Sequence, residues 1–189
     1  MQFEPQKMYH IYNRGNNSQK VFFTRENYLF FLRKIRQHLL PHCQLLAYCL
    51  LPNHFHFLIE TPENMTEQAI NQGIAIILRS YTQAINKQEN RTGSLFQQGS
   101  KAKNVENGDA NYPFICFQYI HQNPMAAKLV QKMEDWEFSS FKDYINQRNG
   151  TLCNKTLAIQ LLDLPQNAEE FYKQSYNVIA NEEIKQILV

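Results

Sequence analysis

Hydrophobic and polar positions alternate along three early segments of the chain, and this pattern predicts strands. The segments are residues 7–15, 43–51 and 54–60. Pro52 and Asn53 separate the second segment from the third, and this pair is typical of a tight turn. The sequence therefore predicts a hairpin within its first third.

Apolar residues at three- and four-residue spacing predict two amphipathic helices around that hairpin. One covers residues 24–40, with Thr24 as the expected N-cap. The other starts after Asn64 or Thr66 and runs to residue 88.

Two more elements are expected downstream. Residues 95–105 are expected to be extended, with Gly99 as a possible bulge. A helix is expected from residue 112, with Pro113 in its first turn. It either continues beyond Pro124 after a kink or restarts there. Weaker patterns indicate helices near residues 155–163 and 167–188.

The order of the first six elements is β-α-β-β-α-β, which is the order of a ferredoxin-like fold. We therefore expect an α+β protein whose antiparallel sheet is covered by helices. The expected division is a catalytic-type domain over residues 1–150 and a C-terminal helical extension over residues 151–189.

The charge balance changes along the chain. Residues 1–155 hold 17 Lys and Arg against 12 Asp and Glu, whereas residues 156–189 hold 2 against 5, which gives a net charge of +2. By itself this balance indicates only ordinary solvated surface. The four cysteines lack C-x-x-C spacing, and the first residues lack a signal-peptide core, so we expect reduced thiols, no membrane segment and a cytoplasmic protein.

His54 and His56 lie one residue apart in the predicted strand "HFHFLIE". In a strand these two positions share one face, with Cα atoms about 7 Å apart, so both imidazoles can approach one divalent ion. Phe55, Phe57 and Ile59 then face the core. The simpler alternative is that both histidines form ordinary hydrogen bonds, and a metal site still needs a third ligand from elsewhere.

Tyr119 and Asn123 lie one helical turn apart in "FQYIHQNP" and therefore share a helix face. An activated tyrosine can act as a nucleophile, and an amide oxygen can complete a metal site. From helix position alone, packing in the core remains the simpler interpretation for Tyr119.

The segments "PNHFHFLIE", "GSLFQQGSKAKNV", "QYIHQNPMAAKLV" and "WEFSSFKDY" occur in this order. Together with "NRGNNSQKVF" they resemble the single-tyrosine HUH transposases, the IS200-like family, and within it the branch of REP-associated tyrosine transposases. The resemblance covers roughly residues 8–145.

This resemblance implies an enzyme of DNA transposition that uses Mg²⁺ or Mn²⁺ and cuts single-stranded DNA, often near a hairpin. It implies metal binding by His54 and His56 and attack on a phosphodiester by Tyr119, with a 5′-phosphotyrosine intermediate. Asn123 matches the position of the third ligand. Members of the family act as monomers or homodimers.

Cations and rings in loops and strand ends are the expected DNA contacts, since cations bind phosphates and rings stack on bases. Arg14, Lys101 and Lys103 are the candidate phosphate contacts, and Tyr12 is a candidate stacking ring. After "LFQ" many relatives carry an Arg followed by an aromatic residue. This chain has Gln98, Gly99 and Ser100 instead, which brings the register of DNA binding into question.

Two other classes of protein remain open from the sequence. A non-catalytic or domesticated protein on the same fold would bind single-stranded nucleic acid without cutting it. A structural protein would use the two histidines for a stabilising ion and would not bind DNA. The target sequence, the role of the acidic tail and the oligomeric state are not encoded in any pattern that we recognise.

Overall fold

The computed structural model describes residues 1–107, 111–177 and 179, and its centre is one antiparallel sheet. The strand order is β2-β3-β1-β4, and every neighbouring pair is antiparallel. This is the ferredoxin-like arrangement predicted from the element order. The strands are β1 (Met8–Arg14), β2 (Gln44–Leu51), β3 (His54–Glu60) and β4 (Lys101–Asn104).

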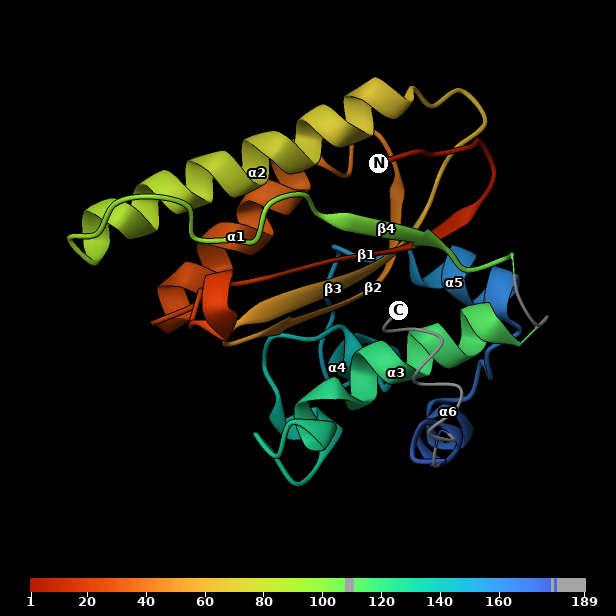
Figure 1. Ribbon diagram of the computed structural model, residues 1–189. Helices are drawn as coiled ribbons and strands as arrows, with labels where there is room; N and C mark the ends of the chain where they lie inside the picture. The colour runs from red at the N-terminus through yellow and green to blue at the C-terminus, as the bar shows by residue number, and fades with distance from the viewer. Residues whose placement is uncertain (108–110, 178, 180–189) are drawn as a thin grey trace.

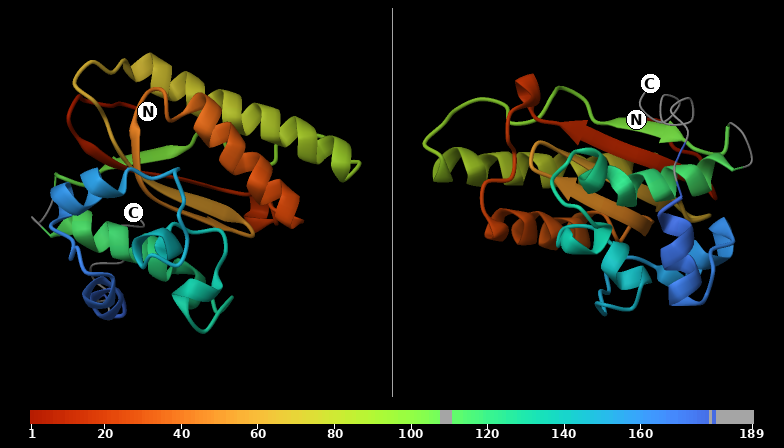
Figure 2. Two further views of the ribbon diagram at one scale, coloured as in Figure 1. Left: turned by 180° about the vertical axis from the view of Figure 1, so that it is seen from behind. Right: turned by 90° about the horizontal axis from the view of Figure 1, so that it is seen from below.

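Helices cover both faces of the sheet (Figure 1). One face is covered by α1 (Arg25–His38) and α2 (Glu67–Gln88), and the other by α3 (Tyr112–Ala126) together with three shorter helices. The view from below in Figure 2 shows α3 lying across the strands. The shorter helices are α4 (Phe141–Tyr144), α5 (Lys155–Leu162) and α6 (Ala168–Ser175), and two 3₁₀ turns are η1 (Asn16–Ser18) and η2 (Met133–Asp135).

Alternation along β3 separates the two cores. Phe55, Phe57 and Ile59 are buried against α1 and α2, as the sequence predicted. His54 and His56 therefore lie on the opposite face, where α3 packs. This division places the two polar side chains of β3 beneath one helix, α3.

The face of α3 that meets the sheet is set by its sequence. Cys116, Tyr119, Ile120 and Asn123 recur at three- and four-residue spacing and are all buried. Behind α3, Phe171 of α6 packs edge-on against Phe117. The C-terminal helices therefore share the second hydrophobic core with α3, which fixes the helix that carries the tyrosine.

The "WEFSS" segment covers the outer edge of β2. The Leu50 amide donates to the Phe138 carbonyl, and the Trp136 indole N–H donates to the Leu50 carbonyl at 3.0 Å. The Phe138 ring stacks on Tyr28 with centroids 3.8 Å apart. Pairing of this edge prevents β2 from adding a strand of another chain.

Several predicted boundaries are confirmed. Thr24 forms a capping box at the start of α1, Thr66 is the N-cap of α2, and Pro113 lies in the first turn of α3. Of the alternatives left open at Pro124, the structure has the continuous helix, because α3 runs to Ala126.

Two other expectations are modified. The extended segment is a strand only from Lys101, and Phe96 pairs with Gly15 in an isolated bridge before it. Between these two pairings, residues 97–100 lie opposite residues 13–14, so the pairing is irregular at the predicted Gly99, which has φ +74°. The helix expected over residues 167–188 is observed as α6, which ends at Ser175 and therefore earlier than predicted. Residues 178 and 180–188 of that prediction lie outside the described residues. No helix among the described residues is long and apolar enough to cross a membrane.

Candidate metal and tyrosine site

The register of β1 and β3 brings the paired histidines beside aromatic and cationic residues of β1. His56 lies opposite Tyr12, and His54 lies opposite Arg14. His54 and His56 have ring centroids 5.0 Å apart, with planes at 88°. The two rings are therefore neighbours on one face of the sheet, as their spacing predicted.

α3 lays Tyr119 directly over these rings. The Tyr119 ring meets His56 edge-on with centroids 5.5 Å apart, and only 8% of the residue is exposed. The tyrosine predicted from the helix pattern and the histidines predicted from the strand pattern thus lie in one site.

Asn123 connects the tyrosine with the histidines. Burial raises the pKa of the Tyr119 hydroxyl and lowers that of His54, and an interaction with the Asn123 amide opposes a part of each shift. Its Nδ2 also donates to the Tyr119 carbonyl oxygen at 3.3 Å. An amide therefore lies beside both groups with which it was expected to act.

Burial keeps the titratable groups of this site neutral. It lowers the pKa of His54 to about 4 and that of His56 well below its ordinary value of 6.5. Burial also raises the pKa of Tyr119, an effect that Asn123 and the positive charge of Arg14 partly oppose. Neutral imidazoles are the form that binds metal ions, whereas the phenol needs further activation before it can attack.

The donor atoms present fit a divalent ion. His54 Nδ1 lies 2.6 Å from the Asn53 amide oxygen, which leaves the other ring nitrogen of His54 outside that bond. His56 Nε2 is buried without a hydrogen-bond partner among the described residues, and a bound cation would satisfy it. No group of three His, Cys, Asp or Glu side chains spaced for a metal occurs in residues 1–107 and 111–177. The amide of Asn123 lies beside His54, and an amide oxygen is a further type of donor that divalent ions accept.

A family model for IS200-like transposases matches residues 5–123 of the chain, well over half of its length. The chain belongs to the IS200-like transposase family. The match includes both histidines, Tyr119 and Asn123.

This IS200-like transposase is distantly similar to REP-associated tyrosine transposases. A putative REP-associated tyrosine transposase of Haemophilus influenzae is 28% identical over 109 residues, which cover 52% of this chain and 58% of that relative. The chain thus matches little more than half of the relative's length.

The fold has a counterpart among solved structures. The structure of a REP-associated tyrosine transposase bound to a REP hairpin matches with a TM-score of 0.62 at 17% identity, over 78% of this chain and 84% of that one. The likeness confirms the α+β fold with a four-stranded antiparallel sheet.

A cavity of about 320 Å³ opens beside the transposase's histidines and Tyr119. Arg14 and Lys101 line it, together with Tyr12 and the loop residues Gln97–Gly99. Lys101 also lies over the Tyr12 ring, 5.9 Å from its centroid. Lys103, the third predicted phosphate contact, is not among the lining residues and lies over Tyr112 instead.

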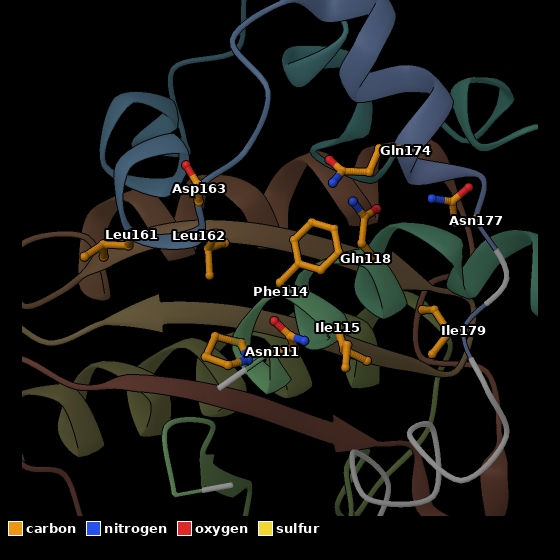
Figure 3. Close-up of a pocket in the computed structure, with 11 residues that line it drawn as sticks. Asn111, Phe114, Ile115, Gln118, Leu161, Leu162, Asp163, Gln174, Asn177 and Ile179 are labelled. Atoms are coloured by element: carbon orange, nitrogen blue, oxygen red, sulfur yellow. The ribbon is translucent and has the colours of Figure 1, made fainter. Parts of the chain in front are cut away.

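A second cavity of the transposase lies elsewhere. It has about 550 Å³ and is lined by α3, the end of α5 and the end of α6 (Figure 3). Figure 3 shows the Gln118 amide and the Phe114 ring pointing into it. None of the site residues predicted from the sequence lines this cavity. His54, His56 and Tyr119 line the smaller one.

His10 is the site residue that sequence reasoning missed. It is fully buried on β1, and its Nε2 lies 2.8 Å from His56 Nδ1. A polar residue at an alternating position of "MYHIY" was the available signal. That signal gains meaning only from the strand order, which places β1 next to β3.

Proposed function

We propose that this chain is a metal-dependent nuclease and strand transferase that cuts single-stranded DNA through a covalent bond to Tyr119. Membership of the transposase family supports the reaction class. The observation that carries the residue assignment is the edge-on contact of the Tyr119 ring with His56, whose Nε2 has no hydrogen-bond partner among the described residues. Nucleophile and metal donors therefore lie within reach of one phosphate.

In the proposed step, the Tyr119 oxygen attacks phosphorus and the bond from phosphorus to the 3′ oxygen breaks. The 5′ phosphate stays on the tyrosine, and the proton lost by the phenol is balanced by the one gained at the released 3′-hydroxyl. One phosphodiester is exchanged for another, so rejoining by a 3′-hydroxyl needs no nucleotide cofactor.

Mg²⁺ or Mn²⁺, held by His54, His56 and Asn123, would polarise the phosphate as a Lewis acid. The chain's own groups orient the reactants. Arg14 and Lys101 supply positive charge at the cavity for the DNA backbone, and Arg14 opposes a part of the rise in the Tyr119 pKa that burial causes. Tyr12 is half-buried at the cavity and offers a ring for a base.

The substrate that we propose is single-stranded DNA beside a hairpin. The solved relative that shares the fold is bound to a REP hairpin. The cavity wall supports a single strand because it combines two cations with an aromatic ring, the combination that binds a backbone and a base together.

The test uses single-stranded hairpin oligonucleotides labelled at either end and incubated with Mg²⁺ or Mn²⁺. A 5′-phosphotyrosine retains the 3′-labelled fragment on the protein in a denaturing gel and releases the 5′-labelled fragment with a free 3′-hydroxyl. Tyr119→Phe should abolish the adduct and retain DNA binding.

Tyr12→Phe is the matched control, since it removes the other hydroxyl of the same cavity. It should still form the adduct. An adduct that persists in Tyr119→Phe and disappears in Tyr12→Phe would overturn the assignment. DNA binding without any adduct would favour the non-catalytic alternative.

A further inference from the structure

His10 of β1 contacts His56, one of the two candidate metal donors, and has no role in the mechanism proposed above. His10 and His56 are both nearly or fully buried, with 0% and 3% of their surfaces exposed. Their rings lie side by side and nearly parallel, with centroids 5.0 Å apart and planes at 15°. The contact between His10 Nε2 and His56 Nδ1 at 2.8 Å must be a hydrogen bond in which one ring donates and the other accepts.

Two arrangements of the ring protons satisfy this hydrogen bond. In the first, His56 donates from Nδ1, and its Nε2 keeps a lone pair; His10 then carries its own proton on Nδ1. In the second, His10 donates from Nε2, and His56 carries its proton on Nε2, where it blocks coordination. Both arrangements hold the same number of protons, so exchange between them needs no net uptake or release.

We propose that His10 is a positioning residue: its Nε2 accepts a hydrogen bond from the Nδ1–H of His56 and thereby holds the Nε2 lone pair of His56 toward a divalent cation. This inference rests on the metal site of the proposed function. Metal-binding histidines are commonly fixed through their second nitrogen, and that partner sets the tautomer and the ring orientation.

The neighbouring donor has the same arrangement. His54 Nδ1 contacts the Asn53 amide oxygen, which can only accept, so His54 also carries its proton on Nδ1. Asn53 Nδ2 in turn donates to the Ser18 carbonyl, which agrees with this orientation of the amide. Both imidazoles are thus held through Nδ1, one by an amide and the other by a histidine.

The cation selects the first arrangement because the second has a proton where the ion would bind. His10 Nδ1 has no hydrogen-bond partner among the described residues in either arrangement. His56 Nε2 also has no hydrogen-bond partner among the described residues, so without a cation each arrangement leaves one unpaired N–H and one unpaired acceptor. We therefore expect the cation itself to decide between the two arrangements and to hold both rings in the first one.

Calorimetric titration with Mn²⁺ alone, without DNA, is the first test. His10→Leu places an apolar side chain in the buried position and removes the Nε2 acceptor. It should weaken Mn²⁺ binding 10- to 100-fold. His10→Gln places an amide near the position of Nε2 and should restore much of the affinity. His121→Gln, at a buried histidine outside the site, should bind Mn²⁺ like the wild type.

The second test reads the tautomers directly in the wild-type protein, so it does not depend on a variant that folds. Long-range ¹H–¹⁵N correlation spectra distinguish the protonated from the bare nitrogen in each of the six histidines. Addition of Mg²⁺ should leave His56 protonated at Nδ1 and His10 protonated at Nδ1.

The outcomes separate the two proposals. Wild-type affinity for Mn²⁺ in a folded His10→Leu, or a His10 that stays protonated at Nε2 in the Mg²⁺ form, would overturn the positioning role alone. A wild-type protein that binds neither ion would overturn the metal site itself and the proposed function with it.

Discussion

At the scale of single residues, His121 shows how burial links stability to pH. The residue is fully buried on α3, its Nε2 lies 2.7 Å from the Ser140 hydroxyl, and burial lowers its pKa to about 3 from 6.5. The unfolded chain therefore binds a proton at a higher pH than the folded chain does. Stability is complete above pH 6.5 and falls as the pH drops from 6.5 toward 3.

We expect protonation of His121 in the unfolded chain to lower the unfolding free energy by about 2 kcal/mol as the pH falls from 6.5 to 5. His121→Gln can retain a hydrogen bond to Ser140 without titrating, so its stability should fall less over this range. Urea unfolding at both pH values measures the difference. Equal losses in the two proteins would show that this imidazole does not carry the effect.

Gln118 and Gln122 are two amides on α3 with opposite surroundings. Gln118 is 2% exposed, and neither its oxygen nor its nitrogen has a partner in the part of the chain that the structure describes, whereas Gln122 donates to the carbonyls of Ser175 and Asn177. A buried amide without a partner destabilises the fold.

Gln118→Met should therefore raise the unfolding free energy by about 1 kcal/mol, and Gln122→Met should lower it by a similar amount. Both are measured from urea midpoints on purified protein. A loss of stability in Gln118→Met would mean that its amide has a partner in solution inside the larger cavity.

At the scale of elements, a buried ion pair fixes the segment between α4 and α5. Arg148 contacts both carboxylate oxygens of Asp143 at 2.7 and 2.9 Å and donates to the Glu137 carbonyl. Asp143 is 1% exposed, and its carboxylate also accepts from the Gly150 amide.

Arg148→Met should cost about 3 to 5 kcal/mol of stability, because it leaves the Asp143 carboxylate buried without its cation. Arg25→Met is the control, since the Arg25–Glu137 pair is exposed and its loss should change the stability little. Chemical denaturation of both variants compares them. Similar small losses would indicate that water reaches Asp143.

The elements were predictable to the extent that local patterns determine them. Alternation in β3 predicted both its core face and its histidine face, and Thr24 and Thr66 marked the helix starts, with a capping box at Thr24. Pro124 left two alternatives, because a proline inside a helix is tolerated only when packing compensates, and that packing comes from elements distant in sequence.

The site was predictable in its individual groups but not in its assembly. His54, His56, Tyr119 and Asn123 were identified from spacing and family resemblance, and their roles stay predictions. His10 was missed because its meaning depends on the pairing register of β1 with β3. Register depends on the whole fold, and no short segment encodes it.

At the scale of the whole molecule, the proposed site is formed entirely within one chain. α3 places Tyr119 over His56 of the same polypeptide, and the C-terminal helices pack behind α3 through contacts such as Phe171 with Phe117. The division into residues 1–150 and 151–189 stays a prediction, and the shared core indicates that the second part supports the first.

Assembly within one chain predicts that two inactive variants cannot rescue one another. A mixture of Tyr119→Phe with His56→Ala should form no covalent DNA adduct, because each molecule lacks one half of its own site. The denaturing-gel assay used for single variants measures this. An adduct in the mixture alone would show that tyrosine and histidines come from different copies.

A nucleophile and its metal donors that share one backbone stay together at any dilution. If the proposed chemistry holds, a low concentration of the protein lowers the rate at which it encounters DNA, but each bound molecule is fully active. A host that expresses only a few copies would thus limit the number of rearrangements without abolishing them, and low abundance would regulate their frequency.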